Sequence, residues 1–123
     1  MLAELLMLAS LVSQYGLNWQ ALGARAITRA VDHDTIFVTG EQGSFHAIKL
    51  TVRGSTVRIR RVVLHFETGE AQDLVLHGLV PDGGETKAIH LKGDRRAIRS
   101  IEVWYDAKSV GRKGAVVELD GRD

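Results

Sequence analysis

The feature that most constrains this fold is an alternation of apolar and polar residues with a period of two. Between residues 46 and 53, the apolar side chains of Ile48, Leu50 and Val52 alternate with polar ones. The same pattern recurs where Val57 and Ile59 are separated by arginines. Successive side chains of a strand point to opposite faces, so this period is typical of strands that are buried on one side.

Turn residues separate the alternating runs at short, regular intervals. Examples are Gly40–Gly43, Pro81–Gly84 and Gly111–Gly114, which combine Gly with Pro, Asp or charged residues. Short strands with tight turns and no intervening helical pattern describe an antiparallel sandwich or a barrel, and we predict an all-β, jelly-roll-like antiparallel β-sandwich. The eight expected strands are approximately 24–31, 35–39, 44–52, 56–66, 72–79, 86–91, 97–105 and 114–120.

One expected strand breaks its own alternation. Val57 and Ile59 would share a face with Val62, Leu64 and Phe66 only if one extra residue were inserted at Arg60-Arg61. A β-bulge makes such an insertion and returns the apolar set to the core. We therefore predict a bulge there, with Arg61 either on the surface or aimed at a ligand.

The first twelve residues form an apolar run, MLAELLMLASLV, interrupted only by Glu4 and Ser10. The run is shorter than the roughly 20 residues that span a bilayer, so we expect no transmembrane span. Its length suits the apolar region of an export signal, but it is also a good short amphipathic helix over residues 2–13. We expect residues 1–17 to be an export-signal remnant or a docking helix, and 18–123 to be one sandwich domain.

The composition excludes several kinds of site. The chain of 123 residues has no Cys, which removes disulfides, thiolate metal sites and a Cys nucleophile. No nucleophile elbow, phosphate loop or dinucleotide motif is present. The five histidines lie on separate segments without metal-ligand spacing. We therefore predict no enzyme activity, no cofactor and no metal. The histidines are His33, His46, His65, His77 and His90.

Local pairing suggests roles for some of these histidines. The Thr68-Gly69 turn would pair the strands of His65 and His77 and place His65 near Gln72 or Asp73. We expect such a His–acid contact to be a surface pair, with an assembled His/acid catalytic site as the alternative. Asp32-His33-Asp34 has the composition of a turn, and His46 is expected to be hydrogen-bonded and inward-facing.

Basic residues gather near the C-terminus. Residues 87–113 hold eight Lys or Arg against three Asp or Glu, although the whole chain has a net charge of only +1. A basic surface beside aromatic residues can bind an acidic glycan, while the near-neutral chain argues against nucleic acid and for solvated edge charges. The candidate binding residues are Arg95, Arg96, Arg99, Trp104, Lys108, Arg112 and Lys113.

The two basic turns, 92–96 and 107–114, should lie at opposite ends of the strand 97–105. Within that strand Ile101, Val103 and Tyr105 share one face, so Trp104 must point the other way. There it would be a platform for a sugar ring or would be covered by the segment around Trp19, and we expect the cover.

Seven stretches of the chain combine strand patterns with turn residues in a recognisable order: 19–23, 32–36, 43–45, 48–50, 61–70, 83–86 and 98–105. Through these stretches the chain resembles a bacterial family of small exported proteins known only as a domain of unknown function. The resemblance covers roughly residues 19–121 and consists of strand pattern and turn residues. It implies export to the periplasm or beyond, and it implies no reaction.

Three functions remain open from the sequence. The first is a non-enzymatic binding module, periplasmic or secreted, with a protein or glycan partner. The second is a structural subunit that oligomerises or docks through residues 1–16. The third is an enzyme whose site the fold assembles from histidines and acids.

Overall fold

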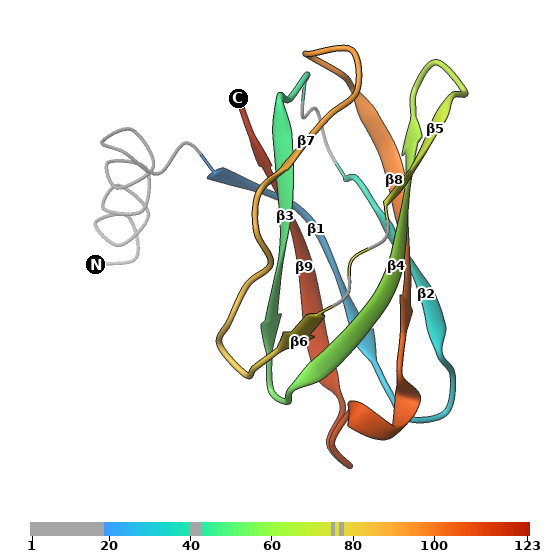
Figure 1. Ribbon diagram of the computed structural model, residues 1–123, viewed down its shortest axis with the longest axis vertical. Coiled ribbons are helices and arrows are strands. Elements are labelled where there is room, and N and C mark those ends of the chain that lie inside the picture. The colour runs from blue at the N-terminus through green and yellow to red at the C-terminus, as the bar shows by residue number, and fades with distance from the viewer. Residues whose placement is uncertain (1–18, 40–42, 75, 77) are drawn as a thin grey trace.

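The computed structural model describes residues 19–39, 43–74, 76 and 78–123, and these residues form a two-layer sandwich (Figure 1). This confirms the predicted all-β antiparallel architecture. The helix expected at residues 2–13 lies outside the described residues. The strands are β1 (Trp19–Ile27), β2 (His33–Phe37), β3 (Ala47–Arg53), β4 (Val57–Phe66), β5 (Ala71–Leu74), β6 (Gly78–Val80), β7 (Ile89–His90), β8 (Ile98–Tyr105) and β9 (Ala115–Arg122), with a short 3-10 helix η1 (Ala107–Ser109).

Every strand pair is antiparallel, and the strands divide between two sheets. The first sheet has the order β1-β9-β3-β7, and the second has the order β2-β8-β4-β5, with β6 also paired to β4. The long strands β9, β3, β8 and β4 are central, so their alternating apolar residues supply both inner faces.

The core lies between the sheets and has the composition that the alternation predicts. Ile48 and Leu50 of β3 face Leu64 of β4 and Ile101 of β8, and all four are almost fully buried. Leu74, Leu76 and Ile89 are partly buried and pack at its margin. The apolar residues of the alternating runs thus form this core and its margin: Ile48, Leu50, Val57, Ile59, Leu64, Phe66, Leu74, Leu76, Ile89, Ile101, Val103, Val117 and Leu119.

The bulge predicted in β4 is present. Ile59 pairs with Tyr105 and Arg61 pairs with Trp104, so Arg60 is the extra residue opposite β8. Val62, Leu64 and Phe66 consequently return to the core side. A second register shift, between His65 and Phe66, leaves Arg99 unpaired in β8.

Two expected strand boundaries are wrong. The first strand covers Trp19–Ile27 rather than 24–31, because Trp19 to Ala21 pair with the end of β9 and the chain turns after Ile27. The expected strand 72–79 is two strands, β5 and β6, which pair with different parts of β4. Both errors arise because pairing with a distant strand decides where a strand ends.

Truncation of Ile101 to Ala should lower the free energy of unfolding by about 2–5 kcal/mol, since it opens a cavity in a fully buried site. Urea unfolding of Ile101→Ala and of the exposed control Lys108→Ala measures this. A loss below about 1 kcal/mol for Ile101→Ala would contradict the described core.

A buried acid lies on the outer side of the first sheet. Asp120 of β9 is only 6% exposed, although its side chain points away from the core. Burial raises the pKa of Asp120 to about 7, and a hydrogen bond and like charge from Glu118 add to this effect, while Lys49 opposes it. The native protein therefore holds a proton here that the unfolded chain releases near its ordinary value of 3.8.

Replacement of Asp120 by Asn should stabilise the protein at slightly alkaline pH. The contribution of Asp120 to wild-type stability falls as pH rises from about 4 to about 7, because over that range this group binds more protons in the native state than in the unfolded state. Asp120→Asn should remove this fall and gain on the order of 2 kcal/mol near pH 8. Asp94→Asn, an exposed acid, is the control. Parallel stability–pH curves for wild type and Asp120→Asn would refute the assignment.

Candidate binding face on the second sheet

The outer face of the second sheet carries a dense group of polar and aromatic side chains. Alternation produces it: Ile36, Ile101 and Leu64 point into the core, so the residues next to them point out. No other described strand packs against this face (Figure 1). The group, called the binding face below, consists of His33, Thr35 and Phe37 from β2, Ser100, Glu102 and Trp104 from β8, Arg61, Val63 and His65 from β4, and Asp73 from β5.

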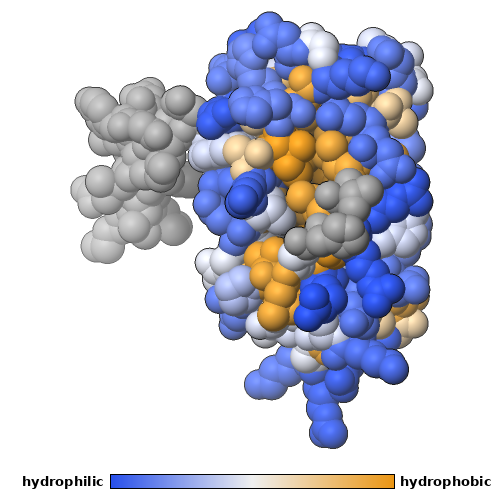
Figure 2. Space-filling view, in the orientation of Figure 1, coloured by the Kyte–Doolittle hydropathy of each residue, from blue (hydrophilic) through white to orange (hydrophobic). Residues whose placement is uncertain are grey.

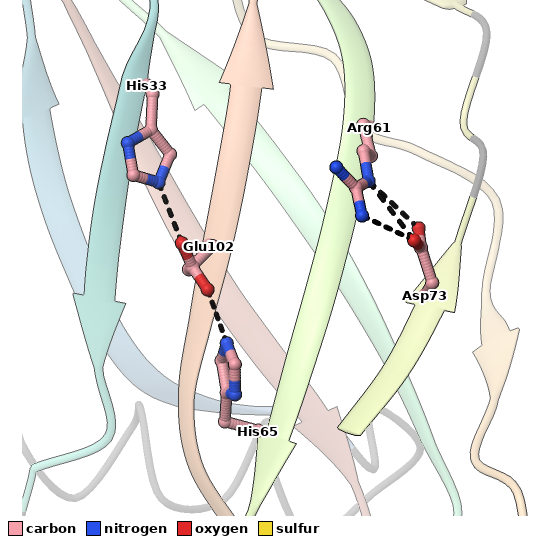
Figure 3. Close-up of polar contacts among 5 residues, drawn as sticks. All are labelled: His33, Arg61, His65, Asp73 and Glu102. Atoms are coloured by element: carbon pink, nitrogen blue, oxygen red, sulfur yellow. Dashed lines mark hydrogen bonds and ion pairs between the residues drawn. The ribbon is translucent and has the colours of Figure 1, made fainter.

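Glu102 connects two histidines from the strands on either side of it. Its Oε2 lies 2.9 Å from Nε2 of His33, and its Oε1 is hydrogen-bonded to Nε2 of His65 (Figure 3). An ionised carboxylate only accepts, so each imidazole donates through Nε2. The hydrogen bond from His65 holds the pKa of Glu102 below its ordinary value, against the opposing effect of burial, and the bond from His33 adds to it.

Trp104 is held between two neighbours in the same row of the sheet. The ring of His33 stacks on the indole with centroids 4.4 Å apart and planes 21° apart. The guanidinium of Arg61 lies 4.8 Å from the indole centroid. His33 and Arg61 both pair with Trp104, from β2 and β4 respectively. The two faces of the indole are therefore occupied from opposite sides.

The predicted outward direction of Trp104 is confirmed, but the expected cover by Trp19 is wrong. Trp19 belongs to the first sheet, where Lys49 and Arg122 lie over its ring. Residues 13–18, the rest of the expected cover, lie outside the described residues. Neighbours on its own sheet cover the indole of Trp104, because cross-strand pairing brings them within reach.

Arg61 is fixed by Asp73 of the adjacent strand. Its Nη2 donates to Oδ2 at 2.5 Å and its Nε to Oδ1 at 3.1 Å, which is a bidentate pair (Figure 3). The hydrogen bond from Arg61 lowers the pKa of Asp73. The bulge thus directs Arg61 along the binding face, where Asp73 and Trp104 hold it.

The surroundings of three histidines differ from the sequence predictions. The turn at Thr68-Gly69 pairs His65 with Ala71, so His65 meets neither Gln72 nor Asp73 and turns to Glu102 instead. His46 is hydrogen-bonded to Asp94 at 2.9 Å, but it is partly exposed rather than inward-facing. His33 lies in β2 and not in the turn. His77 lies outside the described residues.

The predicted basic residues do not form one site. The two turns lie at opposite ends of β8, as expected (Figure 1). In the first turn and the start of β8, Arg95 pairs with Asp123, Arg96 with Glu70 at 2.8 Å, and Arg99 with Glu67 at 3.9 Å. At the other end, Lys108 lies in η1, and Arg112 and Lys113 lie in the turn before β9. Their binding role stays a prediction.

Sequence reasoning missed Glu102 and His33 as site residues. No motif marks them, because 69 residues separate His33 from Glu102 and 37 separate Glu102 from His65. Only the outward alternation of β8, which places Glu102 beside Trp104, carried a usable signal. Within the described residues, no group of three or more His, Cys, Asp or Glu is arranged to hold a metal ion.

Replacement of Glu102 by Gln should weaken the fold and flatten its response to acid. Wild-type stability from this group is complete above the ordinary carboxyl pKa of 4.5 and is lost as pH falls through the lowered value in the folded state. On acidification below about pH 4.5, Glu102→Gln should therefore lose less of its free energy of unfolding, measured with urea, than the wild type. Glu67→Gln, which changes an exposed glutamate, should leave the pH dependence of the free energy of unfolding as in the wild type. The same pH dependence in all three proteins would contradict the assignment.

The described residues contain no helix with the length and apolar character needed to cross a membrane. No curated protein matches the chain. Among solved structures, the sandwich is similar to a chain from the work "Structural and functional characterization of Pseudomonas aeruginosa AlgX", with a TM-score of 0.55 and 13% identity. The match covers 82% of this chain but 26% of that one, and at this identity it shows the fold alone. The profile of the family described as Domain of unknown function (DUF2541) matches residues 1–121, and the chain belongs to that family.

Proposed function

We propose that the protein is a non-enzymatic interaction module that binds a partner protein through the binding face. The observation that carries the proposal is that the principal side chains of this face are fixed by one another before any partner arrives. Trp104 is held between His33 and Arg61, and Glu102 is held between His33 and His65. Because these side chains are already ordered, a partner would lose less conformational entropy on binding them.

The residue types support a protein as the partner. Trp, Arg and other aromatic residues dominate the binding energy of protein interfaces, and Phe37 of the same face is 62% exposed. A sugar ring normally stacks on a free aromatic face, whereas both faces of Trp104 are occupied. A flat sheet surface with an exposed Phe at one edge is thus better suited to a protein than to a glycan.

The hydrogen bonds of the face support a non-enzymatic role. Both histidines use Nε2 to hold Glu102. In the described part of the chain, no hydrogen bond joins a nucleophilic side chain to either imidazole ring. The lowered pKa of Glu102 keeps this carboxylate ionised, so it is unsuited to act as a general acid near neutral pH. The group has the organisation of a rigid surface.

Export remains a prediction from the apolar N-terminal run and from the resemblance. Docking or oligomerisation through residues 1–16 also remains a prediction, because those residues lie outside the described part of the chain. Neither of these two predictions affects which face of the sandwich is proposed to bind the partner.

The proposal is tested by photo-crosslinking in cells that make the protein. A benzoylphenylalanine introduced at Thr35, on the binding face, should give one discrete cross-linked protein. Benzoylphenylalanine introduced at Thr51, on the outer face of the first sheet, should not give this cross-linked protein. Phe37→Asp in the Thr35 variant should remove most of the product, because it places a charge on the exposed aromatic contact.

Equal cross-linking from Thr35 and Thr51 would refute the choice of face. Saturable binding of an oligosaccharide that Phe37→Asp abolishes would replace the protein partner with a glycan. Turnover in a broad hydrolase screen that is lost in both His33→Ala and His65→Ala would overturn the non-enzymatic role.

A further inference from the structure

A gap opens beside β4 at the bulge. On this side of the strand, β5 pairs with Val62 to His65 and β6 pairs with Val57 to Ile59. Arg60 and Arg61 lie between these two stretches, and no described strand pairs with them on this side. The described strands that pair with this edge of β4 are therefore interrupted at this point.

Two grooves meet at the gap. One, of about 410 Å³, is lined by Arg58, Ile59, Arg60 and Gly78. The other, of about 540 Å³, shares Ile59 and Gly78 and extends past β6. Both volumes fall within the range of roughly 300–1,000 Å³ that is usual for small-molecule sites. Because they share two lining residues, we treat them as one groove.

The floor of the groove is apolar. Ile59 and Val80 are buried and point to the core, and Leu76 is half-buried. Leu79 pairs with Arg58, so its side chain points to the outer side of the sheet, where it is 53% exposed. Figure 2 shows apolar surface on this side of the molecule, around the position of β6 in Figure 1. Contiguous exposed apolar surface is characteristic of a ligand groove.

The rim of the groove is cationic. Arg58 and Lys87 form no ion pair with any described residue, and Arg60 is 3.9 Å from Asp106. The one acid of the lining, Glu85, is held by Lys49 at 2.9 Å. Two cations without an acidic partner among the described residues, Arg58 and Lys87, therefore border the groove.

We propose that this groove binds an amphipathic anion, in which an unbranched apolar chain carries a carboxylate or phosphate head group. The apolar chain would lie over Leu76 and Leu79, where it removes exposed apolar surface from water. The head group would lie between Arg58 and Arg60, which can donate charge-assisted hydrogen bonds to it. This site is separate from the binding face and does not depend on the function proposed for it.

The test uses the full chain and a dansyl-labelled undecanoate, whose fluorescence rises in an apolar site. The probe should bind saturably at one site per chain. Laurate or dodecyl phosphate should displace it, and the ratio of their affinities identifies the preferred head group. Dodecyltrimethylammonium, which has the same chain and the opposite charge, should displace it at least about tenfold less well.

Variants locate the site. The double variant Arg58→Ser, Arg60→Ser should weaken laurate about tenfold, and Leu79→Ser should weaken both the anion and the cation. The control Arg112→Ser, Lys113→Ser removes the same charge from the turn after η1 and should change nothing. Circular dichroism and thermal unfolding establish that each variant is folded, and Lys87→Ser provides a second rim variant if the double variant is not.

Three results would overturn the proposal. The first is the absence of saturable binding. The second is a lack of specificity, seen either as equal displacement by the anionic and cationic amphiphiles or as equal loss in the control variant. The third is displacement by a peptide of residues 1–16 at lower concentration than laurate, which would identify the chain's own apolar segment as the occupant.

Discussion

The extra residue in β4 is the constraint on which the rest of this structure depends. If β4 continued past Ile59 without the bulge, Val62, Leu64 and Phe66 would face solvent, and Arg61 and His65 would face the core. Burial of the apolar set and exposure of the polar set both favour the shifted register. One inserted residue thus determines the inner face of the second sheet and the composition of its outer face.

The same bulge separates two surfaces of different chemistry. Arg61 is directed along the outer face, where Asp73 and Trp104 hold it in place. Arg60, its neighbour, borders a groove with an apolar floor. One surface is flat and rigid because its side chains bind one another, and the other is hollow because the partner of β4 changes from β5 to β6. Bulges often lie beside functional surfaces for this geometric reason.

Charge is distributed by pairing and not by position in the sequence. The basic residues Arg95, Arg96 and Arg99 each have an acidic partner from another part of the chain. Arg58 and Lys87, which are not among the candidate binding residues of the sequence analysis, have no acidic partner among the described residues. A cluster counted along the chain is therefore a poor guide to surface potential, because opposite charges from distant strands lie beside it.

By itself, the sequence determined the fold class, the inward and outward faces of most strands, the position of the bulge and the outward direction of Trp104. These properties are local, since a period of two and its interruption can be read within one strand. Only the tertiary structure decided which strands are neighbours. That choice brings His33 and His65 to Glu102, moves the start of β1 to Trp19 and divides the expected strand 72–79 into β5 and β6. The physical reason is that pairing and register depend on residues far apart in the chain, whose contacts no local pattern specifies.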